Sequence, residues 1–432
     1  MPTTLANWAA NQRWVAARVA APRSTEEVAV LVREAAAVGQ RVKALGGRHS
    51  FTAAAETDGL QLTLDRMHRV LEVDRDRGRV RVQGGIRLHH LSEALAAVGL
   101  AMPNLGDIDR QSIAGAIATA THGTGLAFGN LATTVVGIQL VDGRGDVVTV
   151  DETTDPDLLR VARVGLGALG IVTEVTLQCV PAFNLHARET IEPLDDVLDG
   201  LLEHAAAVDH FEFYWMPGGG KRCQVKRNRR TDEPPRPQPR AAYVRDKLLG
   251  ENLGFGLVCR VGRRFPTAAP RVARLVTSAA AERDLIDRSD RVFCSPRWVR
   301  FVEMEYAIPV EHLADAVREV RAATRRLATP ILFPVEVRVS AADDIPLSTA
   351  SGRTTGWIAV HQYRGAPYEE YFGLVERILD GVGGRPHWGK LHTQRAETLA
   401  PRYPGWAEFQ AARDRLDPDR TFANPYLDRV LG

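Results

Sequence analysis

The sequence predicts an α+β protein with two domains. Its 432 residues exceed what one ordinary hydrophobic core holds. The first 180 residues show short strands of alternating hydrophobicity, separated by many glycine turns. Strands and helices then alternate from about residue 300 to residue 381, which is typical of a domain centred on one antiparallel sheet. We expect domains at 1–180 and 181–385, and a carboxy-terminal segment at 386–432 that returns to the first domain.

The first domain is predicted to begin with a helix whose cap is visible in the sequence. Ser24 and Glu27 form a capping box, and apolar residues follow at helical spacing up to about Gly39. Strands are predicted where apolar and polar residues alternate. The remaining predicted elements are a helix at 88–98 and strands at 41–45, 60–64, 70–73, 79–83, 133–149 (two strands around a turn) and 171–180.

The second domain is predicted to contain a long loop. Residues 218–240 are rich in glycine, arginine and proline, which indicates a solvated loop. A nucleic-acid-binding patch is the alternative, but no aromatic residues are interleaved with the arginines. An aromatic segment at 211–215 precedes this loop, and the elements predicted after it are strands at 302–308, 332–339 and 357–363 and helices at 311–327 and 368–381.

Charge and composition exclude several classes of protein. With 55 basic and 53 acidic residues, the net charge of +2 gives no reason to expect nucleic acid or an anionic membrane as a partner. The four cysteines are far apart, which argues against structural zinc and against a disulfide framework. Neither a signal peptide nor an apolar stretch of about 20 residues is present. We therefore expect a cytoplasmic protein without a metal site.

The run Gly46-Gly47-Arg48-His49-Ser50 is the most informative about chemistry. Adjacent glycines let the backbone adopt positive φ and approach a ligand closely, which leaves amide groups free to bind phosphate. His49 follows directly, and a neutral imidazole is nucleophilic near pH 7. The alternative for this run is an ordinary loop.

Two further glycine-containing segments lie downstream. Residues 112–125 are nearly all small, so a cofactor can lie flat against the backbone, and their hydroxyl groups can bind phosphate. A tightly packed helix followed by a glycine turn, with His122 as a core histidine, is the alternative. Residues 164–173 echo a GxGxxG pattern but precede a strand, so they do not fit a nicotinamide-binding fingerprint.

Together these segments resemble the PCMH-type FAD-binding domain of the vanillyl-alcohol oxidase superfamily. From Asn7 to Leu431 the chain resembles the aldonolactone and alditol oxidases, a family that includes L-gulono-1,4-lactone and D-arabinono-1,4-lactone oxidases. The motifs that carry this resemblance are Gly46–Ser50, Asn104–Ile108, Thr121–Gly125, Glu336–Arg338 and His387–Lys390.

The resemblance implies FAD as cofactor, joined covalently to His49 through its 8α-methyl group. It matches Gly46, Gly47, Arg48 and Ser50 to the turn that binds the pyrophosphate. Further residues matched to FAD contacts are Gly106, Ser112, Gly115, Thr119, Ala120, Thr121, His122, Gly123, Ile171 and His387. It matches Glu336, Arg338 and Lys390 to polar residues that face the substrate and carry the catalysis.

The residue types agree with these catalytic roles. Glu336 and Arg338 are two positions apart on a predicted strand, so both side chains point to one face and can hold a sugar hydroxyl. An exposed ion pair is the alternative. Lys390 is one of five lysines beside fifty arginines. Its point charge suits the negative charge that develops on the flavin during hydride transfer, and Trp388 is expected to limit solvent there.

Four more residues bear on the substrate and the electron acceptor. His361 and Tyr363 alternate onto one strand face and are expected to line the same cavity. By the resemblance, Gly106 lies near the C4a–N5 edge of the flavin and leaves room for dioxygen, which favours an oxidase. Asp107 is expected to contact the substrate, but it replaces the serine of alditol oxidases, which disfavours acyclic polyols.

We therefore expect a monomeric FAD-dependent oxidase of an L-gulono- or D-arabinono-1,4-lactone. Hydride passes to flavin N5, Glu336 takes the hydroxyl proton, Lys390 and Arg338 stabilise the reduced flavin, and dioxygen reoxidises it to give hydrogen peroxide. The alternatives are an alditol oxidase acting on xylitol or sorbitol and a lactone dehydrogenase with another electron acceptor. A flavin- or nucleotide-binding protein without redox turnover and a nucleic-acid-binding protein are more distant alternatives.

Overall fold

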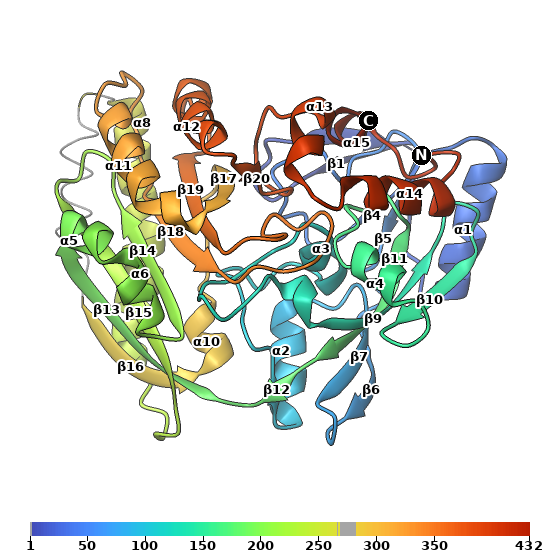
Figure 1. Ribbon diagram of the computed structural model, residues 1–432, viewed down its shortest axis with the longest axis horizontal. Helices are drawn as coiled ribbons and strands as arrows, with labels where there is room; N and C mark the ends of the chain where they lie inside the picture. Colours follow the sequence, from blue (N-terminus) through green and yellow to red (C-terminus); the bar gives the residue numbers. More distant parts are fainter. Residues whose placement is uncertain (1, 266, 268–281) are drawn as a thin grey trace.

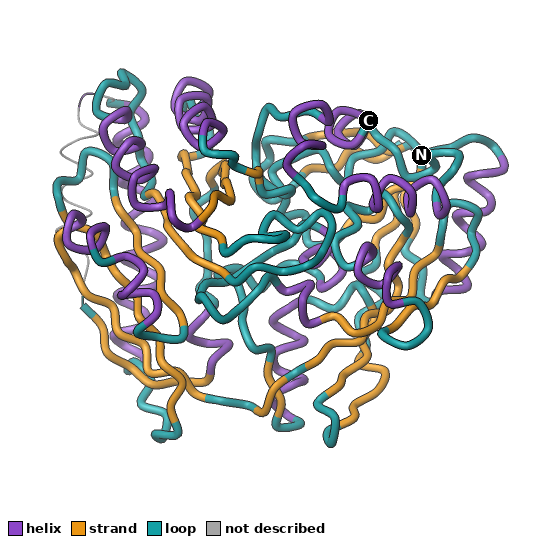
Figure 2. The backbone as a smooth tube through the Cα atoms, viewed as in Figure 1, coloured by secondary structure: helices purple, strands orange, loops and turns teal. Residues whose placement is uncertain are grey.

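Two groups of β-sheet face each other across the middle of the molecule (Figure 1). The computed structural model describes residues 2–265, 267 and 282–432. One group consists of small sheets from the first part of the chain, and the other is a single eight-stranded sheet with helices on its outer face. Loops fill most of the space between the two groups (Figure 2). Among the described residues, no helix is long and apolar enough to cross a bilayer.

The first group contains two sheets of three and five strands. The three-stranded sheet is parallel, in the order β3-β5-β4, and the five-stranded sheet is antiparallel, in the order β10-β9-β11-β7-β6. The strands of these two sheets are β3 (Arg18–Ala20), β4 (Val42–Leu45), β5 (Leu60–Thr63), β6 (Val70–Asp74), β7 (Arg79–Gln83), β9 (Val135–Val141), β10 (Val147–Asp151) and β11 (Ile171–Gln178). Two-stranded ribbons join β1 (Thr3–Ala6) to β2 (Arg13–Ala16), and β8 (Leu100–Ala101) to β12 (Val180–Pro181).

Local sequence signals account for these elements. Helix α1 (Thr25–Ala37) begins where the Ser24 hydroxyl accepts a hydrogen bond from the amide of Glu27, as the capping residues predict. In β11, buried and half-buried residues alternate along the whole strand, so one face packs on the core. The other helices of this group are α2 (Leu88–Ala97), α3 (Ile113–Ala118) and α4 (Pro156–Ala162), with a 3₁₀ turn at Leu131–Thr134.

The large sheet is antiparallel throughout, as predicted for the second half of the chain. Its strand order is β16-β13-β15-β14-β18-β19-β17-β20. The strands are β13 (Asn184–Pro193), β14 (His210–Trp215), β15 (Arg222–Thr231), β16 (Arg283–Arg288), β17 (Phe301–Pro309), β18 (Val335–Ser340), β19 (Thr355–Tyr363) and β20 (Arg385–Pro386). The helices of this part are α5 (Leu194–Asp199), α6 (Leu201–Ala206), α7 (Arg240–Tyr243), α8 (Phe255–Arg264), α10 (Ser289–Phe293), α11 (Leu313–Thr324) and α12 (Glu369–Gly381). A 3₁₀ turn lies at Val310–His312, and a π-helical segment lies at Val244–Gly254.

Alternation along the central strands separates two faces of the large sheet. On β14, Phe211 and Phe213 pack in the apolar core beneath the helices, together with Val335 and Val337 of β18. The residues between them in sequence point to the opposite face, because successive side chains of a strand alternate. That opposite face looks toward the first group of sheets, and it carries the polar side chains of the site.

The prediction of a loop at 218–240 is wrong for the central part of this range. Strand β15 occupies Arg222–Thr231 and pairs with both β13 and β14 in the interior of the large sheet. Cys223 and Val225 are buried on the helix-covered face, whereas the four basic residues that follow obscured this alternation in the sequence.

The carboxy-terminal helices lie against the first group of sheets and close to the amino terminus (Figure 1). They are α13 (Ala396–Leu399), α14 (Trp406–Leu416) and α15 (Pro425–Leu431), with a 3₁₀ turn at Ala400–Arg402. The amide of Val42 donates to the carbonyl of Thr421 over 2.8 Å, and the buried ammonium of Lys43 donates to the carbonyl oxygens of Gly167 and Phe422. The domain boundaries proposed from the sequence remain a prediction.

Candidate active site

A cavity of about 800 Å³ lies between the two groups of sheets. His49, Gly106 and His122 line it from the first group, whereas Glu336 and Lys390 line it from the large sheet and the carboxy-terminal segment. Ligand sites commonly form where two such parts meet. The cavity therefore brings together motifs that are up to 341 positions apart in sequence, from residue 49 to residue 390.

The glycine turn before His49 differs from the prediction in its backbone. Neither Gly46 nor Gly47 has a positive φ; that conformation falls on Arg48, whose φ is 61°. The glycines are required for close packing instead, since a Cβ on Gly46 would lie 2.4 Å from the Ser112 hydroxyl oxygen. A Cβ on Gly47 would lie 2.7 Å from the carbonyl oxygen of Arg110. The turn thus rests directly on the segment that precedes α3.

Three of the five described non-glycine residues with positive φ lie in the three glycine-containing segments, and the other two are Ala10 and Arg420. Arg48, Ala120 and Leu166 each have φ between 53° and 61°, a region that non-glycine residues seldom adopt. One such residue lies in each segment. Strain of this kind clusters at ligand sites, where the surrounding structure holds it in place.

His49 presents a ring nitrogen that the described residues leave without a hydrogen-bond partner. This buried atom is Nδ1, and the ring stacks against Trp8 with 5.8 Å between centroids. Burial lowers the pKa of His49, and together with the nearby cations Arg87, Lys390 and Arg110 it brings this pKa to about 4. The imidazole is therefore neutral at pH 7, which is the state in which it can attack an electrophile or hold a cofactor covalently.

The predicted cofactor residues fall into two sets. Those that line the cavity are His49, Ser50, Gly106, Thr119, Thr121, His122 and His387. Those that are not among its lining residues are Gly46, Gly47, Arg48, Ser112, Gly115, Ala120, Gly123 and Ile171. Members of the second set support the wall from behind: a Cβ on Gly123 would lie 2.3 Å from the amide oxygen of Asn104, and Ile171 lies in the core beside α1.

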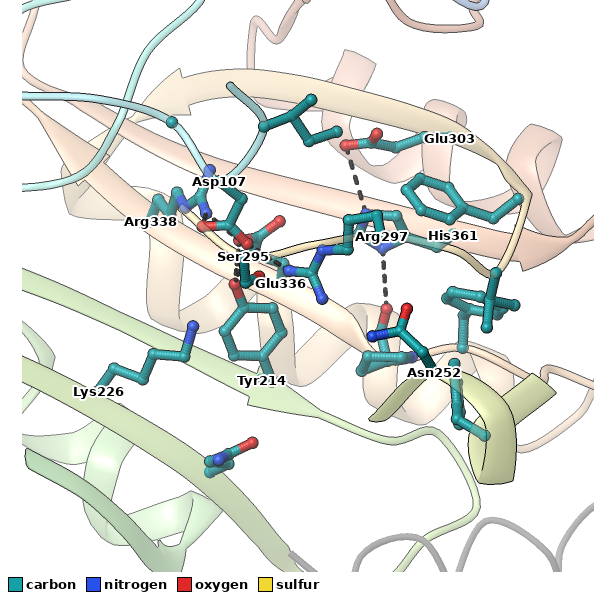
Figure 3. Close-up of a pocket in the computed structure, with 18 of the residues that line it drawn as sticks. Asp107, Tyr214, Lys226, Asn252, Ser295, Arg297, Glu303, Glu336, Arg338 and His361 are labelled. Atoms are coloured by element: carbon teal, nitrogen blue, oxygen red, sulfur yellow. Dashed lines mark hydrogen bonds and ion pairs between the residues drawn. The ribbon is translucent and has the colours of Figure 1, made fainter. Parts of the chain in front are cut away.

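On the opposite wall, Arg338 is surrounded by three carboxylates. Figure 3 shows two of them, those of Asp107 and Glu336. The Arg338 guanidinium lies 2.7 Å from Asp107, 2.7 Å from Glu212 and in direct contact with Glu336. Strand register explains part of this arrangement, because Glu212 on β14 pairs directly with Arg338 on β18. The expectation that Glu336 and Arg338 share a face is confirmed by their direct contact.

Two more cations balance this cluster. Lys226 on β15 lies 2.8 Å from Glu212, and Arg297 lies 2.5 Å from Asp107. The hydroxyl of Tyr214 donates to Glu336 over 2.5 Å. Three acidic and three basic side chains therefore share one buried cluster.

The carboxyl groups of this cluster differ in their pKa. Burial raises the pKa of Glu336, and the neighbouring carboxylates Asp107 and Glu212 add to that rise while Arg338 opposes it. Burial acts in the same direction on Asp107, but Arg338, Lys226 and Arg297 outweigh it and lower the pKa of Asp107. Of these two, Glu336 is the group suited to accept a proton near neutral pH.

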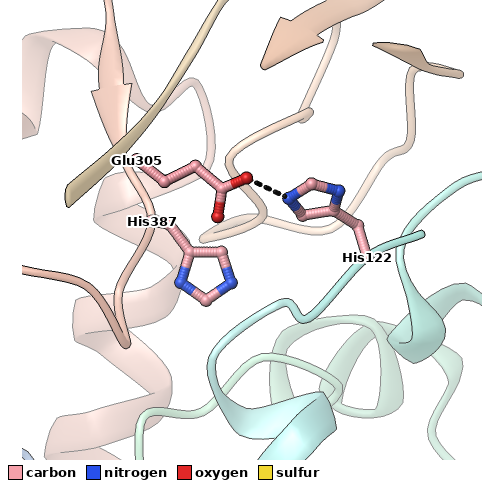
Figure 4. Close-up of side chains that lie close together, drawn as sticks. All are labelled: His122, Glu305 and His387. Carbon is pink, nitrogen blue, oxygen red and sulfur yellow. Dashed lines mark ion pairs between the residues drawn. The ribbon is translucent and has the colours of Figure 1, made fainter. Parts of the chain in front are cut away.

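A second set of charges lies on β17. Glu303 and Glu305 point to the cavity from alternate positions, and each holds an imidazole: Glu303 lies 3.4 Å from His361, and Glu305 lies 3.2 Å from His122. Lys390 contacts Glu303 directly and lies 3.9 Å from Glu305. Figure 4 shows Glu305 with His122 and His387, which lies on the other side of the carboxylate.

The segment that carries Lys390 is held by the same strand. Glu305 accepts a backbone hydrogen bond from His387, and Glu303 accepts one from Leu391, each over 2.9 Å. The carbonyl of Gly389 in turn accepts from the amide of Phe51, which ties this segment to the turn at His49.

Two expectations about aromatic residues are wrong. Trp388 does not shield Lys390: its indole donates to the carbonyl of Leu347 and stacks on Tyr403 in the core. The ring near the ammonium is that of Phe51, at 5.4 Å. Tyr363 is not among the cavity-lining residues either, because the last residue of β19 lies beyond the cavity, with its ring 5.5 Å from the guanidinium of Arg263.

Several residues of the cavity or the charged cluster were not predicted, although strand alternation indicates some of them. A charged residue at every second position of an otherwise apolar strand indicates that one face meets a polar site. Glu303 and Glu305 within the run Phe301–Pro309 have this pattern. The other missed residues are Glu212, Tyr214, Lys226 and Arg297.

Three groups of side chains in the described part of the chain are close enough to bind an ion. They are His122, Glu305 and His387; Glu303, Glu336 and His361; and Asp107, Glu212 and Glu336. In each group a carboxylate already contacts a histidine, lysine or arginine of the chain. These contacts fit an internally neutralised site better than a metal centre.

Comparisons with known proteins agree with this architecture. A family model described as D-arabinono-1,4-lactone oxidase matches residues 175–430, and one described as FAD binding domain matches residues 16–151. The L-gulono-1,4-lactone dehydrogenase of Mycobacterium tuberculosis is 47% identical, over 99% of this chain and 98% of its own. The alditol oxidase of a Streptomyces species is 33% identical over the full length of both chains, and the L-gulonolactone oxidase of Bos taurus is 32% identical over 98% and 97%.

A solved structure supports the fold. Cholesterol oxidase from B. sterolicum superimposes with a TM-score of 0.84 over 100% of this chain and 97% of its own, at 18% identity. At that identity the likeness concerns the fold alone. The family models and the full-length relatives together show that this chain belongs to the D-arabinono-1,4-lactone oxidase family of FAD-dependent oxidoreductases.

Proposed function

We propose that the chain oxidises a hydroxyl group of an aldono-1,4-lactone of the L-gulono or D-arabinono type. The observation that carries this proposal is the shared cavity, in which Glu336, Arg338 and Lys390 lie opposite the cofactor motifs of His49 and His122. The names of the similar full-length proteins supply the substrate class. A monomeric state and a cytoplasmic location remain predictions from the sequence.

His49 is proposed to hold FAD covalently. A neutral, buried ring nitrogen with no partner among the described residues, at the wall of a large cavity, fits such a bond. Denaturing electrophoresis viewed under ultraviolet light tests it, because only a covalent flavin stays with the unfolded chain. His49→Ala should lose the fluorescent band, whereas His68→Ala, an exposed histidine outside the cavity, should keep it.

The protein groups are proposed to divide the chemistry as follows. When bound, FAD accepts a hydride from the carbon that carries the reacting hydroxyl. Glu336 takes the hydroxyl proton, since burial raises its pKa and Tyr214 holds its carboxylate in place. Arg338 orients that hydroxyl from the same strand face, and Lys390 adds positive charge to the cavity wall.

A ring lactone is proposed in preference to an open polyol. Asp107 is held by Arg338 and Arg297, so its carboxylate is fixed and presents a limited number of free lone pairs. Initial rates with L-gulono-1,4-lactone, D-arabinono-1,4-lactone and xylitol, measured side by side, test this choice. A higher kcat/KM with xylitol would replace the proposal by an alditol oxidase.

Dioxygen is proposed as the electron acceptor, and a second candidate is a dehydrogenase. Gly106 lines the cavity without a side chain, which supports access for dioxygen. Two observations favour the dehydrogenase. The relative at 47% identity has that name. A Cβ on Gly106 would lie 2.9 Å from the carbonyl oxygen of His122, so close packing also accounts for a glycine at this position. One mole of hydrogen peroxide per mole of substrate in air supports the oxidase; turnover only with an added dye or cytochrome supports the dehydrogenase.

A further inference from the structure

Glu303 lies directly opposite His361 in the register of the large sheet. The two residues are paired between β17 and β19, and both side chains are buried on the cavity face. The Glu303 carboxylate lies 3.4 Å from His361 Nε2 and also contacts the ammonium of Lys390. Glu303 thus connects His361, a predicted substrate-binding residue, to Lys390, a predicted catalytic residue.

Both ring nitrogens of His361 face oxygen atoms that only accept hydrogen bonds. Nδ1 lies 3.0 Å from the carbonyl oxygen of Pro334, and Nε2 faces Glu303. An imidazole can donate from both nitrogens only when it is protonated. The other charged groups around it are Glu336 from β18, within 4.8 Å, and Lys390 from the carboxy-terminal segment. The rings of Phe301 and Phe333 also pack near the imidazole.

The charges around Glu303 favour its ionised form. Burial alone would raise the pKa of Glu303, but Lys390 and His361 outweigh it and lower this pKa to about 2. Conversely, burial would lower the pKa of His361, and Lys390 acts in the same direction, but Glu303 and Glu336 together outweigh both and raise it. The positive charge of Lys390 is therefore already balanced by the carboxylate of Glu303.

We propose that Glu303 is a positioning residue for the oxidation: its carboxylate keeps the His361 imidazole protonated and the Lys390 ammonium in place, so that two cations line the substrate side of the cavity. The net charge of these three groups is then +1, whereas a neutral His361 would make it zero. The assignment rests on the proposed function for its catalytic consequence, but its electrostatic part concerns the chain alone. The two cations are thus held by the carboxylate behind them, and Glu305 and Glu336 are the other acidic groups nearby.

The direct test is the titration of His361 in the FAD-loaded protein without substrate. Long-range ¹H–¹⁵N spectra of histidine-labelled protein report the protonation state of each ring, and His361→Asn assigns the signal. In the wild type, His361 should remain doubly protonated above pH 6.5. In Glu303→Gln its titration should move down by at least about one pH unit, because an opposite charge at this distance shifts a pKa by about 1–3 units.

Three further variants separate charge from folding. Glu303→Asp retains the carboxylate and should restore most of the shift. Glu305→Gln removes the carboxylate that faces His122, so the His361 signal should move much less than in Glu303→Gln. Glu311→Gln, at an exposed position just after β17, serves as the matched control for this strand.

Turnover gives the second readout. If the lactone is oxidised, the basic limb of the kcat/KM profile should move to lower pH in Glu303→Gln by the same amount as the His361 signal. A neutral His361 in the wild type at pH 6.5, or a signal that Glu303→Gln leaves in place, would overturn the assignment even if the enzyme is active. If Glu303→Gln instead loses rate at every pH while the basic limb of its kcat/KM profile stays in place, Glu303 has a structural role only and the assignment is wrong. A protein that oxidises no lactone but shows the shift would refute only the proposed function.

Discussion

Replacing Tyr214 with phenylalanine removes the hydroxyl that donates to Glu336 over 2.5 Å. This hydrogen bond stabilises the ionised carboxylate, so its loss should raise the pKa of Glu336 beyond the rise that burial already causes. If Glu336 takes the hydroxyl proton, activity requires its ionised form. The acidic limb of the kcat/KM profile should therefore move to higher pH in Tyr214→Phe.

The size of this shift follows from the strength of the contact. Hydrogen bonds to charged groups contribute about 1.5–3 kcal/mol. At about 1.4 kcal/mol per pKa unit, that range corresponds to a rise of about 1–2 units. The Tyr214 oxygen also lies 3.1 Å from Asp107 and 3.2 Å from Glu212, but its single hydrogen can serve only one of these acceptors well. We therefore expect a value near the lower end of the range.

The assay is the initial rate of lactone oxidation from pH 4.5 to pH 9, with kcat/KM fitted at each pH. Tyr243→Phe, at an exposed tyrosine of α7, is the matched control and should leave the profile unchanged. An acidic limb that stays in place in Tyr214→Phe, or that moves to lower pH, would refute the assignment of Glu336 as the proton acceptor. A uniform loss of rate would point instead to lost positioning of the substrate.

Other contacts lead to predictions about stability. Gly46→Ala should destabilise the fold by about 1–3 kcal/mol, because its Cβ would lie 2.4 Å from the Ser112 hydroxyl oxygen. Adding Ser112→Ala should recover part of this loss. Urea unfolding of the two single variants and of the double variant should therefore show non-additive changes in the free energy of unfolding. Burial lowers the pKa of Lys43 to about 7, so the folded state binds fewer protons than the unfolded state between pH 7 and pH 10. The wild type should therefore gain about 1 kcal/mol of unfolding free energy per pH unit across this window, and Lys43→Met should lose that slope. Trp388→Phe removes the donor to the Leu347 carbonyl, so the free energy of unfolding, measured by heat or urea, should fall by about 1–3 kcal/mol. The kcat should stay within twofold of the wild type, since Trp388 lies outside the cavity.

Most of the elements follow from local sequence signals. The capping residues at Ser24 and the alternation in 79–83 and 171–178 depend on neighbours in the chain, and the structure confirms the helix and strands they predict. The segment at 222–231 shows the limit of such signals. Its basic residues look like those of a solvated loop until β13 and β14 pair with it on both sides.

Residue types and short spacings were enough to predict the family motifs, the antiparallel second half of the chain and the shared face of Glu336 and Arg338. Each of these depends on residue type and on spacing over a few positions. Which charged side chains meet depends on the folded arrangement of distant segments. Lys390 reaches Glu303 across 87 positions of sequence, and Asp107 reaches Arg338 across 231. Electrostatic energy depends on distance and on burial, so the protonation of His361 and Glu336 is set by strand register and by the closing of the cavity, neither of which a local pattern contains.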